Sequence, residues 1–327
     1  MSEAAPAVVA RGLTKSFGRF TAVDHLDLTI ATGEIVGFIG PNGAGKSTTI
    51  RMLCGLLRPS AGSAMIAGFD VVHDPESVRA HIGYMSQKFS LYGDLTVGEN
   101  LRFFAGIYRV PHAIYPERRT FAIAMAGLEG REDVLVRTLA GGWKQRLALG
   151  CAILHRPPVL FLDEPTSGVE PEARRQFWEL IHQLAAEHVT ILVSTHYMDE
   201  AEYCNRIALI DRGRLIAIGS PGDLRRHELG GTLVALDCTK LGAALTALHD
   251  APGVAEAAIF GDRLHVLLTG TGLAADDLPA FLARHGITAT RVQPIIASLE
   301  DVFVRLVTND KPAVTGEGDK PAVIGEG

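Results

Sequence analysis

A glycine-rich loop between an apolar run and a helical run constrains this chain most. The run Glu34–Ile39 is predicted to be a buried strand, and Thr48–Leu57 is predicted to be a helix. The segment that joins them matches every fixed position of the pattern G-x-x-x-x-G-K-[ST]. Its residues, with the Thr48 that follows the pattern, are Gly40, Pro41, Asn42, Gly43, Ala44, Gly45, Lys46, Ser47 and Thr48. Backbone N–H groups of such a loop surround a phosphate, and the helix N-terminus adds partial positive charge. The pattern therefore predicts a nucleoside triphosphate site, with Lys46 on the β- and γ-phosphates and the Ser47 hydroxyl on Mg²⁺.

Composition narrows the class of protein. The 327 residues carry a formal net charge of −6, which argues against a broad nucleic-acid-binding face. The four cysteines are scattered without metal-ligand spacing, so we expect buried thiols in a reducing compartment. The first residues lack the basic and apolar regions of a signal peptide, and no run approaches the roughly 18 apolar residues that span a bilayer. We therefore expect a soluble protein that reaches a membrane only through a partner.

Apolar strands alternate with amphipathic helices from Val8 to about Gly230. The clearest strands are Ile82–Ser86, Val159–Asp163, Thr190–Ser194 and Arg206–Ile210. The Gly and Pro residues that flank these strands, and the helical stretches between them, predict a largely parallel sheet that helices cover on both faces, an α/β fold. Helix follows helix around Thr96–Arg137, and Thr96 with Glu99 predicts a capping box. We predict a first domain over residues 1–230, with a helical subdomain over about 96–150.

The pattern changes after Gly230 and predicts a small α+β domain over residues 231–308. The predicted elements are the strand Thr232–Cys238, the helix Leu241–His249, the hairpin strands Val254–Phe260 and Arg263–Leu268, the helix Ala274–Arg284, the strand Thr288–Gln293 and the helix Ser298–Val307. This βαββαβ order is the ferredoxin-like plan. The remaining residues 309–327 contain a nine-residue repeat, Asp310–Gly318 and Asp319–Gly327, that is rich in Gly, Pro and charge, and they predict a disordered tail.

Four further motifs follow the loop in order. They are Gln87 at the end of a strand, the run Leu139–Arg146 with sequence LAGGWKQR, the strand Val159–Asp163 ending in Asp163 and Glu164, and Ser194–His196. Together they resemble the Q-loop, signature, Walker B and H-loop of ATP-binding-cassette (ABC) ATPases over about Val8–Arg226. The runs Gly142–Leu149 and Thr195–Cys204, the extra C-terminal domain and its Ser298–Phe303 segment resemble the daunorubicin-resistance and YbhF-like multidrug export branch.

The resemblance implies a role for each residue in hydrolysis of the γ-phosphate of ATP, which needs an oriented water and charge neutralisation. Asp163 would hold Mg²⁺, and Gln87 would ligate Mg²⁺ or the water. Glu164, expected on the other face of the strand end, would polarise the attacking water, and His196 would donate to the γ-phosphate. Phe17 lies where the family stacks an aromatic ring on adenine, with Phe20 as a second candidate and a core role for Phe17 as the alternative.

Two positions depart from the family pattern. In the signature, Ala140-Gly141-Gly142 has alanine where a serine is expected, so a helix cap and a hydroxyl contact to the γ-phosphate on an opposite subunit are missing. The glycine N–H groups and the helix dipole remain to bind the anion. Glu170 stands after Walker B where the family has aspartate. We expect a working but slow ATPase.

The resemblance also implies partners. One chain supplies one P-loop and one signature, so a complete site needs a second cassette, either another copy of this chain in an isologous pair or a different cassette. A multi-span permease of an ABC exporter would hold the protein on the cytoplasmic face of the cell membrane, with no nucleic-acid partner. The alternatives are a non-transport ABC ATPase acting on nucleic acid or ribosomes, and a regulatory nucleotide sensor. The absence of a basic arm or heptad run argues against the first, and Glu164 and His196 argue against the second.

Overall fold

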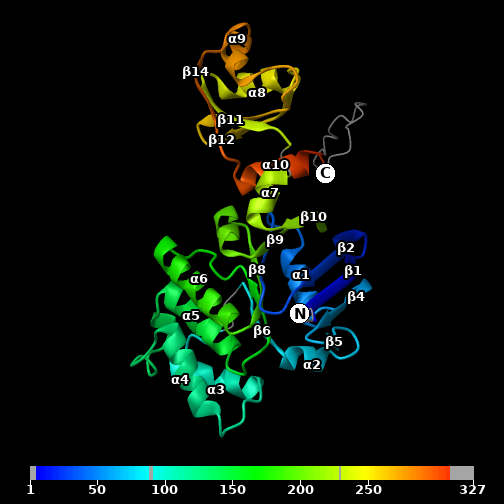
Figure 1. Cartoon of the computed structure of the whole chain (residues 1–327). Helices are drawn as coiled ribbons and strands as arrows, with labels where there is room; N and C mark the ends of the chain where they lie inside the picture. The colour runs from blue at the N-terminus through cyan, green and yellow to red at the C-terminus, as the bar shows by residue number, and fades with distance from the viewer. Residues whose placement is uncertain (1–4, 88–90, 228–229, 310–327) are drawn as a thin grey trace, which may run out of the picture. The chain divides into compact units, whose positions relative to one another are not determined.

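The computed structural model describes residues 5–87, 91–227 and 230–309 (Figure 1). The chain forms two compact units, Met1–Leu224 and Arg225–Gly327, which are described separately below. The repeat predicted to be a tail lies outside the described residues. No helix within the described ranges is long and apolar enough to cross a membrane.

A six-stranded sheet forms the centre of the first unit. Its order is β10-β9-β3-β8-β7-β6, with β3 at Ile35–Ile39, β6 at Ile82–Met85, β7 at Val159–Asp163, β8 at Thr190–Thr195, β9 at Arg206–Asp211 and β10 at Arg214–Gly219. All neighbours are parallel except β10, which is antiparallel to β9. This confirms the largely parallel sheet and its predicted strands. Because parallel strands end at the same edge, the segments that follow β3, β6, β7 and β8 are brought together there.

A second, antiparallel sheet lies in the same unit, and the sequence analysis missed it. Its order is β2-β1-β4-β5, with β1 at Val8–Phe17, β2 at Phe20–Ile30, β4 at Ala61–Ile66 and β5 at Phe69–Asp70. The expected alternation of strands and helices from Val8 onward is therefore wrong for this region. The pairing of β1 with β2 shifts register three times, between Ala10 and Ser16, and each shift breaks the two-residue periodicity that would reveal a strand.

The helices of the first unit include α1 at Lys46–Leu53, α2 at Pro75–Ala80, α6 at Pro171–Ala186 and α7, at Pro221–His227, which continues into the second unit. The helix predicted over Thr48–Leu57 thus begins at Lys46 and ends at Leu53. Gly55, at a φ of +64°, turns the chain away soon afterwards, because that left-handed conformation ends a helix.

A group of helices lies between β6 and β7 in the chain, as Figure 1 shows, with α3 at Val97–Ile107, α4 at Tyr115–Ala126 and α5 at Gly141–Ala152. Side chains of all three form one apolar cluster that includes Leu101, Ala122 and Leu147. The capping box is confirmed: Glu99 N–H donates to Thr96 Oγ1 at 3.2 Å, and Thr96 N–H donates to Glu99 Oε2 at 2.8 Å.

The second unit is an antiparallel sheet in the order β12-β13-β11-β14. Its elements are β11 at Thr232–Cys238, α8 at Leu241–His249, β12 at Val254–Phe260, β13 at Arg263–Leu268, α9 at Leu278–Ala283, β14 at Ala289–Pro294 and α10 at Leu299–Asn309. The predicted element order is confirmed, although the helix predicted over Ala274–Arg284 is a 3-10 turn at Ala275–Asp277 followed by a short α9. Residues Val234, Leu236 and Val266 of the sheet pack with Leu248 of α8 and Leu282 of α9.

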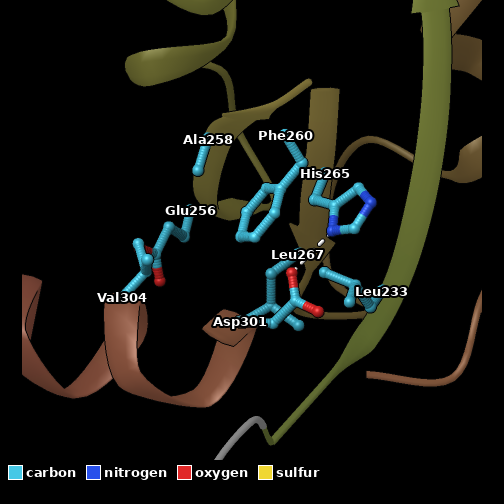
Figure 2. Close-up of a pocket in the computed structure, with 8 residues that line it drawn as sticks. All are labelled: Leu233, Glu256, Ala258, Phe260, His265, Leu267, Asp301 and Val304. Carbon is cyan, nitrogen blue, oxygen red and sulfur yellow. Dashed lines mark hydrogen bonds and ion pairs between the residues drawn. The ribbon is translucent and has the colours of Figure 1, made fainter. Parts of the chain in front are cut away.

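The other face of this sheet carries the alternate residues, and α10 contacts it. Figure 2 shows His265 of β13 and Asp301 of α10 pointing toward one another, with His265 Nδ1 2.6 Å from Asp301 Oδ1. The ring of Phe260 stacks on His265 at 4.3 Å between centroids. The second carboxylate oxygen of Asp301 accepts from the Ser298 N–H at 2.7 Å, so this buried acid caps α10 as well as joining it to the sheet.

Candidate functional site

The glycine-rich loop joins β3 to α1 at the carboxyl edge of the parallel sheet. Two of its glycines are required by close approach of other backbone. A Cβ on Gly40 would clash with the carbonyl oxygen of Ile210, and a Cβ on Gly45 would lie 2.5 Å from that of Ala22. Gly45 also has a φ of +104°, which side chains rarely allow. The loop is therefore fixed in shape by the strands around it.

Lys46 begins α1 and its side chain is 4% exposed. Its Nζ donates to the carbonyl oxygens of Gly40 at 2.7 Å and Pro41 at 3.1 Å. The same Nζ lies 3.5 Å from Glu164 Oε1. Burial lowers the pKa of Lys46, and the carboxylate of Glu164 opposes that shift. The ammonium group is thus held inside the loop, where phosphate oxygens are expected to bind.

Asp163 ends β7 and is 2% exposed. Its Oδ1 accepts from the hydroxyl of Ser47 at 2.9 Å and from that of Ser194 at 2.7 Å. The sequence analysis assigned no role to Ser194, and its only signal was its place directly before Thr195-His196. Two hydroxyl donors orient this carboxylate beside the start of α1.

Glu164 has a φ of +50°, a left-handed conformation that is uncommon for a residue other than glycine. Its N–H donates to the carbonyl oxygen of Ser194 at 3.1 Å. Its Oε2 accepts from Gln87 Nε2 at 3.1 Å and lies 3.4 Å from His196 Nδ1. A left-handed turn, rather than strand alternation, therefore places this carboxylate next to Lys46. The structure brings Gln87, Lys46 and His196 together around Glu164.

A buried glutamate, Glu200, stabilises the segments next to this group of residues, and the sequence analysis missed it. Glu200 is 0% exposed, and its Oε1 accepts from the Thr166 hydroxyl at 2.5 Å and lies 3.3 Å from Arg174 Nε. Arg174 belongs to α6, and its guanidinium group lies 4.2 Å from the ring centre of Tyr197. The segments after β7 and after β8 are thereby tied to α6. Nothing in the run Tyr197–Tyr203 distinguishes this glutamate from its acidic neighbours.

Phe17 and Phe20 flank the turn between β1 and β2 and are 51% and 64% exposed. The alternative that Phe17 is a core residue is therefore wrong. Further along β2, the carbonyl oxygen of Ala22 lies next to Gly45 of the loop. Both rings are thus on the strand pair that adjoins the phosphate loop.

Ala140, Gly141 and Gly142 lie at the start of α5. The contacts that join Lys46, Gln87, Asp163, Glu164 and His196 involve none of the three. Ala140 occupies the N-cap position with φ −63° and ψ 158°, and it makes no side-chain capping bond. Glu170 is the N-cap of α6 and makes none either. Both departures from the family pattern are therefore at helix starts without a side-chain cap.

Comparison with known proteins identifies the family to which this chain belongs. The family described as "ABC transporter" matches residues 23–167, from β2 through the P-loop and β7. Nod factor export ATP-binding protein I of Ralstonia nicotianae is 37% identical over 308 residues, which cover 92% of this chain and 94% of that protein. The chain belongs to the ATP-binding proteins of ABC transporters. A second family, described as an AAA domain and putative AbiEii toxin, matches residues 144–198 of the same cassette.

Two further relatives confirm the export branch that the sequence resembles. The probable multidrug ABC transporter ATP-binding protein YbhF of Escherichia coli is 50% identical over 221 residues, 68% of this chain. That alignment covers only 38% of YbhF, so the chain spans well under half of that relative's length. The daunorubicin/doxorubicin resistance ATP-binding protein DrrA of Streptomyces peucetius is 39% identical over 278 residues, covering 85% of this chain and 80% of DrrA.

Solved structures confirm the mixed α/β fold of the cassette. An ATP-binding subunit of an ABC transporter superposes with a TM-score of 0.62 at 32% identity, covering 67% of this chain and 92% of that one. A dimeric cassette in a post-hydrolysis state, bound to ADP and Pi, gives a TM-score of 0.59 at 26% identity, covering 65% of this chain and 98% of that one.

Proposed function

We propose that this chain is the ATP-binding and ATP-hydrolysing subunit of an ABC exporter and drives a separate membrane permease. The observation that carries the proposal is the meeting of Lys46, Gln87 and His196 at the carboxylate of Glu164, beside the P-loop. The names of the relatives, which include multidrug, Nod factor and daunorubicin export or resistance, support the direction of transport.

ATP would bind with its β- and γ-phosphates in the P-loop. Phosphate oxygens would replace the carbonyls of Gly40 and Pro41 as partners of Lys46. Glu164 would then polarise a water for in-line attack, and Gln87 would orient the same water. His196 would donate to the γ-phosphate and stabilise the charge that develops on it.

The residues beside the P-loop suit Mg²⁺. The Ser47 hydroxyl and the Asp163 carboxylate are oxygen ligands held 2.9 Å apart, and the exposed Gln87 amide offers a third oxygen. In the described ranges, no group of three or more His, Cys, Asp or Glu side chains could hold a metal. Mg²⁺ takes few protein ligands and completes its shell with water and phosphate. The ion would neutralise charge on the transferred phosphoryl group.

Adenine would stack on Phe17, with Phe20 as the second candidate. Both rings are exposed on the strand pair next to the P-loop, and base stacking on an aromatic ring contributes about 1–3 kcal/mol in single-strand binding. A Phe17→Ala variant with weakened ATP binding, and a normal Phe20→Ala variant, would support the first assignment.

The complete catalytic site would need a second cassette. The start of α5 takes no part in the Glu164 cluster of its own chain, and the related cassette with ADP and Pi is dimeric. An isologous pair would bring the signature of each chain to the P-loop of the other, so that both sites are completed together. A different cassette as partner remains the alternative to a second copy of this chain.

The permease would dock in a cavity of about 500 Å³ on the first unit. Leu56 and Ile107 in its lining are 52% and 56% exposed, so two large apolar side chains meet solvent in the same cavity. Tyr84 of β6 also lines the cavity, and the same strand leads to Gln87. The lining also includes Glu76, Arg79 and Arg109, so an amphipathic cytoplasmic helix of the permease fits it and would hold the subunit on the inner face of the membrane.

The second unit is proposed to be a ferredoxin-like accessory domain over residues 231–308, following a cassette over residues 1–230. Its βαββαβ order and the strand order β12-β13-β11-β14 support that assignment. The division of the chain between Leu224 and Arg225 supports a boundary in this region.

Photo-crosslinking in cells tests the transport role. A photoreactive residue at position 56 or 107 should capture one multi-span membrane protein. The same residue at position 65, which is exposed on β4 of the antiparallel sheet in the first unit, should not. Co-expression of that membrane protein should raise ATP hydrolysis by the wild-type chain and not by Glu164→Gln. Capture of ribosomal or nucleic-acid components instead would overturn the transport role.

A further inference from the structure

We propose that Trp143, together with Arg131 and Arg146, positions the first turn of α5 in place of the missing side-chain N-cap. The proposal rests on the proposed function, because the start of α5 is the part that a second cassette would bind. It adds a positioning residue to the signature, beyond the glycines that would meet phosphate.

The start of α5 is weak when judged from its own sequence. Ala140 has the backbone conformation of an N-cap, and its carbonyl accepts from the N–H groups of Trp143 and Lys144, each at 3.1 Å. No side chain completes the cap, whereas α3 in the same group of helices has a full capping box. Gly141 and Gly142 make up the first residues of the helix, and glycine loses the most conformational freedom on folding. Something outside this turn must therefore hold it.

Two guanidinium groups lie over the indole ring of Trp143. The central carbon of Arg131 is 4.6 Å from the ring centre, and that of Arg146 is 4.5 Å from it. Both distances are within the range of a cation–π interaction, for which tryptophan is the best ring. Gly127 at the end of α4 borders this stack, because a Cβ there would be in ordinary van der Waals contact with Arg146 Nη1 at 3.4 Å and with the indole at 3.7 Å.

Attraction to negative charge does not explain why the guanidinium groups of Arg131 and Arg146 lie close together. Positive side chains near a helix N-terminus oppose the helix dipole, and two guanidinium groups repel one another. Among the described residues, neither Arg131 nor Arg146 forms an ion pair with a carboxylate. The ring is the group that both cations share, so removing it should release Arg131 and the first turn together.

The stack also connects the starts of two helices. Arg146 Nη2 donates to Gln176 Oε1 of α6 at 3.0 Å. Gly142 approaches α6 so closely that a Cβ would lie 2.9 Å from that of Ala173. α6 begins after Glu170, which also lacks a side-chain cap. The turn that carries Trp143 is therefore packed against the start of α6 through Gly142, and Arg146 of the stack is joined to the same helix.

The first test measures position directly and does not require catalysis. In the full-length protein without ATP, Trp143→Leu should speed hydrogen exchange of the amides of residues 143 and 144, which donate to the Ala140 carbonyl, at least tenfold. Arg131→Gln should give a smaller increase, and Arg102→Gln, an exposed arginine of α3, should give none. Unchanged exchange in Trp143→Leu would overturn the proposal even if the protein proved not to be an ATPase.

The second test asks whether a true cap can replace the stack. Ala140→Ser should slow exchange of these amides in the Trp143→Leu protein much more than in the wild type, because the wild type is already held. ATP turnover should fall about tenfold in Trp143→Leu, but exchange is the readout for Ala140→Ser, because its hydroxyl should raise turnover in either background. Equal effects of Ala140→Ser in both backgrounds would show that Trp143 only fills space.

The third test separates this proposal from failure of the proposed function. A mixed pair of Lys46→Ala and Trp143→Leu chains retains one site with an intact P-loop and an intact signature, so it should hydrolyse ATP. Lys46→Ala and Trp143→Leu in one chain, paired with wild type, leave no such site and should show the tenfold loss. Equal activity of the two heterodimers, each purified free of homodimers, would overturn the placement of Trp143 in the signature, whereas inactivity of the wild type itself would overturn the ATPase assignment alone.

Discussion

The starts of α1 and α5 are the two helix N-termini that the proposed reaction uses, and they are built differently. Neither has a side-chain cap, since the N-cap residues are Gly45 and Ala140. Around Gly45, backbone encloses the turn: a Cβ would lie 2.5 Å from the carbonyl oxygen of Ala22, and the N–H of Gly213 donates to the carbonyl of Ala44 at 2.9 Å. Ala140 is exposed, and nothing lies within 4 Å of where a Cβ on Gly141 would be.

This difference shows two ways of presenting backbone N–H groups to an anion. At α1 the surrounding strands fix the turn, so its shape is independent of a partner and intolerant of added atoms. At α5 the Ala140–Gly141 end of the turn is exposed, although Gly142 packs against Ala173 of α6, and the turn depends on side chains further along the helix. Such an exposed start suits a surface that must meet another protein.

The largest effect is expected at the carboxylate next to the enclosed helix start. Glu164→Gln should lower ATP turnover by at least about a hundredfold, the usual worth of a general base, because the amide cannot polarise water. ATP affinity should stay within a few-fold of wild type, measured by equilibrium binding. Lys46→Ala is the contrasting variant and should lose ATP binding itself. Undiminished turnover in Glu164→Gln would assign the role of base to another residue.

The next prediction compares the same substitution, glycine to alanine, at the two helix starts. Gly45→Ala should lower the free energy of unfolding by about 1–2 kcal/mol from the left-handed backbone alone, before the clash with Ala22 is counted. ATP binding should fall with it. Gly141→Ala should instead raise the free energy of unfolding by up to about 0.5–1 kcal/mol, because alanine favours helix. Denaturant unfolding measures both, and equal destabilisation by the two variants would contradict the comparison.

A smaller effect is expected from restoring the serine of the family pattern. Ala140→Ser should raise turnover by up to about tenfold, since a recovered hydrogen bond to the γ-phosphate is worth roughly 1.5 kcal/mol in the transition state. Thermal stability should change little if Trp143 already holds the turn. Unchanged or reduced turnover, with normal folding and ATP affinity, would show that Ala140 is no catalytic deficit.

The smallest effect is expected at the start of α6. Glu170→Asp shortens the side chain and supplies a better N-cap, which typically contributes less than about 1 kcal/mol. If half or more of that gain reaches the transition state, turnover should rise about two- to fivefold. Steady-state kinetics of the single variant and of the double variant with Ala140→Ser would show whether the two helix starts act together.

Much of the cassette could be predicted from sequence because its signals are local. The P-loop pattern, the buried run of β7 and the Thr96–Glu99 capping box each lie within a few neighbouring residues. The antiparallel sheet was missed because bulges interrupt the periodicity of β1. The left-handed turn at Glu164 and the pairing of Glu200 with Thr166 depend on contacts between distant segments, and no local pattern reports those.

The contact between His265 and Asp301 in the second unit has a consequence for cooperativity. One oxygen of Asp301 meets His265 of the sheet, and the other accepts from Ser298 at the start of α10. A helix of 11 residues is marginal on its own, so α10 depends on that start. Because a single carboxylate serves both contacts, undocking α10 from the sheet also weakens the helix. Docking and helix formation of α10 are therefore coupled, and helicity in this segment should fall when the helix detaches from the sheet.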